Sequence, residues 1–270
     1  MDKIKENKIR ELVRKNINEF VEKFETRYME DINNPAGVIN SKKNNIFISQ
    51  LGNEFMFYSA FCRSFDSSFG KVLEKLSNEI ASISFDVILD DISSYLLPEQ
   101  IQRKSYIMNE YDKHVKPKIE DYANLKAYKP ENIDSFKKKH VTDNHFYNEK
   151  TKEHYIVELK AGGDLDVKKA KSEKEALIDE YFILKNALID EDEGIKIFLA
   201  TAYNRYGEDN QWSQERVKQY FSDDELLIGK QYWNFVCDDE KGYDIIVDEY
   251  KICSKKILDA LDRIKRAYFN

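Results

Sequence analysis

Residues 141–175, VTDNHFYNEKTKEHYIVELKAGGDLDVKKAKSEKE, hold the pattern that decides the fold. A polar insert at 148–151 precedes the apolar residues Tyr155, Ile156 and Val157, which predicts a β-hairpin with its turn at the insert. After Gly162 and Gly163 the apolar spacing becomes helical and continues to about residue 189. The run GIKIFLA at 194–200 is the next predicted strand, and a right-handed crossover should place it parallel to the strand before the helix.

Asp143, Glu158 and Lys160 form the group in this stretch that can carry chemistry. Residues two apart in a strand share a face, so Glu158 and Lys160 project together. Asp143 falls on the neighbouring strand of the hairpin and can converge with them on one divalent cation. Two carboxylates on Mg²⁺ with an adjacent ammonium are the apparatus of phosphodiester hydrolysis. The alternative is a solvated hairpin with ordinary surface charges.

Composition bounds the class of protein. The chain has 270 residues, of which 41% are hydrophobic, enough to bury a substantial core. A net charge of −7 argues against a protein that coats DNA through sheer basic charge, but allows basic groups gathered in one cleft. The three cysteines lack metal or disulfide spacing, and the N-terminus has no signal-peptide pattern. We expect a cytoplasmic protein.

The chain is expected to form one α/β domain, a mixed β-sheet flanked by helices with extensive helical additions at both ends. The expected parts are an N-terminal helical extension at 1–45, the core at 46–212 and a C-terminal helical part at 213–270. Amphipathic spacing predicts helices at 2–30, 50–65, 67–81, 227–236 and 242–269.

Polar side chains near the predicted site suit nucleic-acid contacts. A basic run follows the strand that bears Glu158 and Lys160 (the ExK strand). The strand at 194–200 opens into a loop rich in Asn, Gln and Arg, side chains that suit hydrogen bonds to base edges. An ordinary surface patch and an ordinary loop are the alternatives. The residues expected to contact DNA are Lys168, Lys169, Asn204, Arg205, Asn210 and Gln211.

The Asp143…Glu158-Leu159-Lys160 spacing resembles the PD-(D/E)xK nucleases, whose core is the restriction-endonuclease fold. The string VELKAGGDLDVKKAKSEKEALIDEYFIL, with SSFGKVLEKLSNEIA and IGKQYWNFV, resembles the TdeIII-type family of type II restriction endonucleases over about 50–269. One departure is Thr142, which stands where the family motif has proline, so Asp143 is the less secure half of the motif.

This resemblance implies a restriction-modification enzyme that cuts double-stranded DNA with Mg²⁺ at a short palindrome, of the GGNCC kind. The implied metal ligands are Asp143, Glu158 and the Leu159 carbonyl, with Lys160 as the catalytic lysine. Glu74 would assist, as an early-helix glutamate, and Glu54 is a weaker candidate of the same kind. A palindromic target implies a homodimer. A cognate DNA methyltransferase is expected alongside.

Two other functions fit the residues. The same chemistry could serve DNA repair, recombination or a branched junction. A helical module that binds nucleic acid or protein without catalysis would make the ExK pattern accidental.

Overall fold

The computed structural model describes residues 1–162 and 164–269 and divides them into two compact units. Unit 1 comprises residues 1–79 and 244–270, and unit 2 comprises residues 80–243. Residues 46–79, expected in the nuclease core, are therefore grouped with the N- and C-terminal helices. Each unit has its own core and is described by itself.

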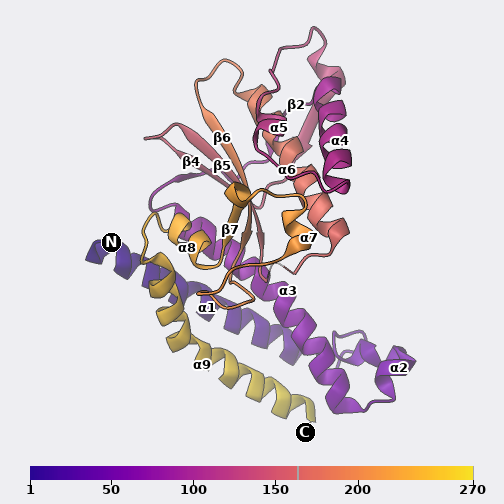
Figure 1. Ribbon diagram of the computed structural model, residues 1–270. Helices are drawn as coiled ribbons and strands as arrows, with labels where there is room; N and C mark the ends of the chain where they lie inside the picture. The colour runs from indigo at the N-terminus through magenta and orange to yellow at the C-terminus, as the bar shows by residue number, and fades with distance from the viewer. Residues whose placement is uncertain (163, 270) are drawn as a thin grey trace. The chain divides into compact units, whose positions relative to one another are not determined.

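Unit 1 is built from long helices (Figure 1). Its elements are α1 (Lys3–Asp31), η1 (Asn40–Asn44), α2 (Ile46–Ser49), α3 (Asn53–Ala81, entering unit 2 at its end) and α9 (Gly242–Phe269). Aromatic rings fill its core, where Phe24 meets Phe61 with ring centroids 5.3 Å apart. The two helices expected at 50–65 and 67–81 are one helix, which corrects the prediction of a break between them. Gly70 lies within that helix and does not interrupt it.

Unit 2 holds a five-stranded mixed sheet in the order β1-β4-β5-β6-β7. Its strands are β1 (Asp86–Val87), β4 (Asn144–Asn148), β5 (Glu153–Lys160), β6 (Gly194–Thr201) and β7 (Leu226–Ile228). The β4–β5 pair is antiparallel and β5–β6 is parallel, so the predicted hairpin and crossover are both confirmed. Asn148 Oδ1 accepts from the Lys150 and Thr151 amides, and this explains the tight turn at the predicted insert.

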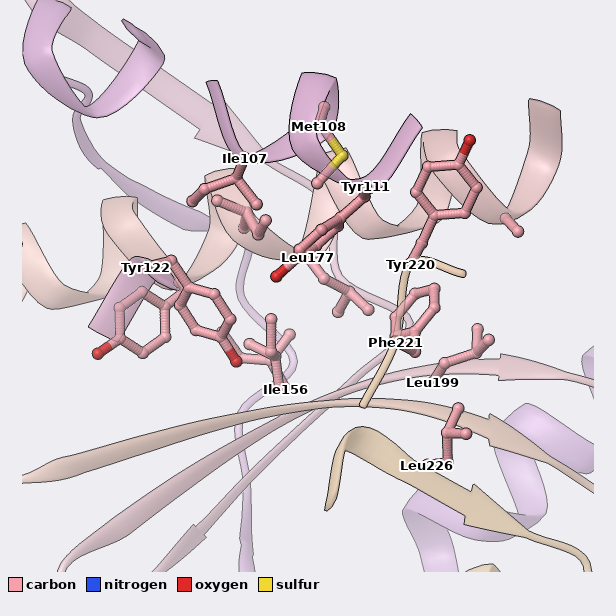
Figure 2. Close-up of a cluster of buried hydrophobic side chains, with 14 of the residues drawn as sticks. Ile107, Met108, Tyr111, Tyr122, Ile156, Leu177, Leu199, Tyr220, Phe221 and Leu226 are labelled. Atoms are coloured by element: carbon pink, nitrogen blue, oxygen red, sulfur yellow. The ribbon is translucent and has the colours of Figure 1, made fainter. Parts of the chain in front are cut away.

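The crossover helix α6 (Val167–Ala187) covers one face of the sheet and contributes a large share of the unit's core. Asp166 caps it by accepting from the Lys169 amide at 2.8 Å. Figure 2 shows side chains from α4, α6 and the sheet meeting in this core, including Ile156 of β5 and Leu177 of α6. Packing on that scale fixes the helix against the strand that bears the ExK residues.

The remaining elements surround this core. They are β2 (Ile92–Tyr95) paired with β3 (Lys137–His140), α4 (Pro98–Asp112), α5 (Glu120–Ala123), η2 (Ile133–Phe136), α7 (Glu215–Lys218), η3 (Asp223–Glu225) and α8 (Lys230–Val236). The helix expected at 227–236 is shorter than predicted, because 226–228 pair with β6 as β7. Gly229, at φ +52°, turns the chain between β7 and α8.

Of the helices in the described residues, none combines the length and apolarity needed to cross a membrane.

Candidate active site at the carboxyl end of strand β5

Asp143 and Glu158 meet across the hairpin. Asn144 of β4 lies opposite Val157 of β5, and one further step along this antiparallel register brings Asp143 opposite Glu158. Glu158 and Lys160 lie on one face of β5 at its carboxyl end, as the period of two requires. The structure therefore brings together the three residues that the sequence singles out.

Glu158 titrates far from its usual range. Burial, together with the negative charge of Asp143, raises its pKa to about 8, although Lys160 opposes both effects. Only 16% of the Glu158 side chain is exposed, so water screens this repulsion weakly. Because the carboxylates of Asp143 and Glu158 repel each other and Glu158 is mostly shielded from solvent, the pair favours a bound cation or a bound proton.

Lys160 is held between two carboxylates. Its Nζ pairs with Glu158, and it lies 3.0 Å from Oε1 of Glu173 on α6. Burial acts to lower the pKa of Lys160, but the two glutamates outweigh it, and the pKa is raised. The lysine is therefore a fixed ammonium in a site rich in negative charge.

Glu173 is not among the residues predicted for the site. The helical spacing could have identified it. Glu173 falls three residues after Ala170 and four before Leu177, and because both of these lie on the buried face of α6, Glu173 lies on that face too. A glutamate on that face needs a partner. Lys160 is that partner.

A second carboxylate on α6 lies near the group. Glu180 is 2% exposed, and its Oε1 lies 2.7 Å from Nδ1 of His140, at the end of β3. Burial raises the pKa of Glu180, and Asp143 adds to that shift while His140 opposes it. Asp143 thus acts on two buried glutamates, Glu158 and Glu180.

The donors around Asp143 fit a hard cation. Across residues 1–162 and 164–269, no three His, Cys, Asp or Glu side chains are grouped so as to hold a metal ion by themselves. A site with Asp143, Glu158 and the Leu159 carbonyl does not require a third such side chain. Mg²⁺ commonly takes one or two carboxylates and keeps several waters. The oxygen donors and the raised Glu158 pKa both suit it.

The residues expected to assist from early helices lie in unit 1. Glu74 is half-buried on α3, and Glu54 is exposed near the start of that helix. Lys265 Nζ lies 3.9 Å from Glu54.

The residues expected to contact DNA fall into two sets. Lys168 and Lys169 are exposed at the start of α6. The others lie in the loop after β6. The last residue of β6, Thr201, pairs in register with Lys160, so the loop begins at the same end of the sheet as the candidate site.

The loop residues differ in what their side chains do. Asn204 is 7% exposed, donating from Nδ2 to the Asn210 carbonyl and accepting from the Tyr206 amide, so it braces the loop. Arg205 pairs with Asp164, and Gln211 is exposed. Asn210 is exposed and donates to the Tyr206 carbonyl.

Gly162 lies close to a side chain of the same chain. A Cβ at this position would meet the Tyr203 hydroxyl at 2.5 Å. Gly163 lies outside the described residues.

Comparison with known proteins identifies the family. Residues 5–254 match the family model described as type II restriction endonuclease, HinfI. The search of curated proteins and the search of solved structures give no match. The resemblance to type II restriction endonucleases is confirmed, but the matching family is HinfI and not the TdeIII type. This chain belongs to the HinfI family of type II restriction endonucleases, nucleases that act on DNA phosphodiester bonds.

Proposed function

We propose that this protein is a Mg²⁺-dependent endonuclease that cuts double-stranded DNA at a short palindromic site, with Asp143, Glu158 and Lys160 as its catalytic group. The observation that carries the proposal is the convergence of Glu158 with Asp143 and of Lys160 with Glu158 at one edge of the sheet. Such a group is what phosphodiester hydrolysis requires, and the family match makes DNA its substrate.

Asp143, Glu158 and the Leu159 carbonyl would hold the cation. When bound, Mg²⁺ would polarise the scissile phosphate and stabilise charge on the leaving 3′-oxygen. The two carboxylates supply the negative charge that attracts it.

Lys160 would orient the attacking water and stabilise the charge that develops on the phosphate. It can do so because Glu158 and Glu173 fix its ammonium from two sides and keep it protonated. Glu173 is then a positioning residue.

A palindromic site is best met by a two-fold symmetric homodimer, because both strands present the same sequence to identical subunits. The biological role would be defence of a cytoplasm against foreign DNA, with a methyltransferase of the same specificity protecting the host. The GGNCC-like site follows only from the TdeIII resemblance, and mapping the ends of the cleaved fragments identifies the recognition sequence. Lys168, Lys169, Arg205, Asn210 and Gln211 would contact the duplex around the cut.

The test is incubation of the purified protein with phage DNA, with and without Mg²⁺, beside Lys160→Ala and Glu158→Ala. We expect discrete Mg²⁺-dependent fragments whose mapped ends share one palindrome, and no fragments from either variant. A smear equally strong in the variants would overturn the catalytic assignment. Preferential cutting of a branched duplex would overturn the palindromic site instead.

A further inference from the structure

We propose that a polar cavity beside the β6–β7 end of the sheet binds the major-groove edge of a guanine in the target DNA, an inference that rests on the proposed function. The cavity has a volume of about 590 Å³. Its walls include the loop after β6, with Gln211 and Trp212, and helix α8, with Gln231 and Asn234. This loop leaves the sheet edge that bears Lys160, since Thr201 and Lys160 are in register.

The cavity is held in shape by bonds within the chain. Glu208 accepts from the Asn204 amide at 2.7 Å and from the Lys230 amide at 2.9 Å, joining the loop to the start of α8. Gly229 makes room for it, since a Cβ there would clash with the Glu208 carboxylate. The site is therefore built before any ligand arrives, which lowers the entropic cost of binding.

Trp212 shows that a polar group in the wall lacks a partner. The residue is 6% exposed, yet within the described parts of the chain its indole Nε1 has no hydrogen-bond partner. A buried N–H without an acceptor is costly.

The amides of α8 add donors of the same kind. Gln231 Oε1 accepts from the Ile228 amide at 3.3 Å, and Asn234 Oδ1 accepts from the Tyr243 amide at 2.9 Å. Both carbonyl oxygens are thus engaged by the chain, and the two NH₂ groups remain to serve a ligand. Gln211 is exposed at the opposite wall.

One carboxylate of the cavity is engaged by the chain, because Glu208 binds the two backbone amides. Asp223 lies 3.3 Å from Lys218 Nζ, but its side chain is 75% exposed. Apart from Asp223, what the cavity offers a ligand is mainly N–H donors. In the major groove, guanine presents two acceptors, N7 and O6, whereas adenine pairs one acceptor with a donor. The donor set matches guanine.

The experiment measures equilibrium binding of the mapped target duplex in Ca²⁺, used as the probe cation, and of a duplex of unrelated sequence. The proteins are wild type, Gln211→Ala, Gln231→Ala and Gln102→Ala. Gln102 is an exposed glutamine on α4 and serves as the matched control. Gln211 accompanies Gln231 because its exposed side chain can be removed without loss of core packing.

We expect Gln231→Ala and Gln211→Ala to weaken target binding about ten- to hundredfold and leave unrelated DNA unaffected, as losing a base contact should. Replacing one target guanine with 7-deazaguanine should weaken wild-type binding but add little to the loss in Gln231→Ala. The control should bind as wild type does. Free dGMP should not bind at the concentrations used for DNA.

Each failure has its own signature. If wild type cuts one defined site while both glutamine variants keep its full selectivity, the cavity does not read a base and the proposed function stands. If the cavity binds dGMP tightly and the variants lose only that binding, it is a site for a free nucleotide, and the inference is overturned. A wild-type protein without sequence selectivity overturns the proposed function, and this inference with it.

Discussion

Lys160 and Glu173 lie 3.0 Å apart, between Nζ and Oε1, and join the end of strand β5 to the crossover helix α6. The same lysine pairs with Glu158 on its own strand. A long, flexible side chain is thus restrained from two sides, which costs rotamer entropy before the substrate binds. In an active site, such restraint keeps the ammonium where charge develops.

Glu173→Gln should therefore slow cleavage without abolishing it. We expect single-turnover cleavage of the mapped site to fall about ten- to hundredfold, at the lower end of what a misplaced catalytic group costs. The loss should grow as pH rises, because Lys160 then keeps only Glu158 to hold its proton. Glu175→Gln, on the same helix, is the control. An unchanged rate and pH profile would remove Glu173 from the site.

The buried pair of Lys174 and Glu225 should dominate the stability of unit 2. Lys174 is fully buried, pairs with Glu225, and lies 4.9 Å from the ring centroid of Tyr122. Tyr122 and Ser222 also donate to Glu225, so every part of the carboxylate is engaged. Breaking such a pair leaves an uncompensated buried charge.

We expect Glu225→Gln to lower the free energy of unfolding by about 3–5 kcal/mol, measured by urea denaturation. Lys174→Met combined with Glu225→Gln should lose less than the two single changes added together, because neither charge is left alone. Additive losses would show that the two side chains act independently.

His145 should make the protein sensitive to acid. It is 4% exposed, its Nε2 lies 2.9 Å from His154 Nδ1, and burial lowers its pKa from 6.5 to about 4. The folded chain then binds a proton more weakly than the unfolded chain. Stability from this group is complete above about pH 6.5 and is lost as the pH falls toward about 4, by about 3 kcal/mol in total.

Urea titrations between pH 7 and 4 check this slope. His145→Gln should flatten it, while His114→Asn, which alters an exposed histidine, should not. An unchanged slope in His145→Gln would mean that other groups cause the acid sensitivity.

The hairpin and the residues of the candidate site on it can be predicted from the sequence, because both depend on local spacing. The period of two puts Glu158 and Lys160 on one face, and the turn at Asn148 sets the register that brings in Asp143. The parallel strand β6 follows from the handedness of crossovers, a rule that needs no knowledge of the packing.

Contacts between distant segments are harder to predict. Glu173 meets Lys160 only because α6 packs across the sheet, and Asn204 turns inward only because its loop folds on itself. The helix α3 continues through Gly70 because packing of its aromatic face outweighs the low helix propensity of that glycine. Propensity is a weak guide where tertiary contacts decide.

The most direct test compares Glu158→Gln with Glu153→Gln, at opposite ends of strand β5. Single-turnover cleavage of the mapped site in Mg²⁺ should fall by about a thousandfold or more in Glu158→Gln, because a metal-binding carboxylate is lost. Glu153→Gln removes a carboxylate that pairs with Lys196, away from the proposed group, and should cut within about threefold of wild type. Equal rates in Glu158→Gln and wild type would contradict the assignment of this edge of the sheet as the active site.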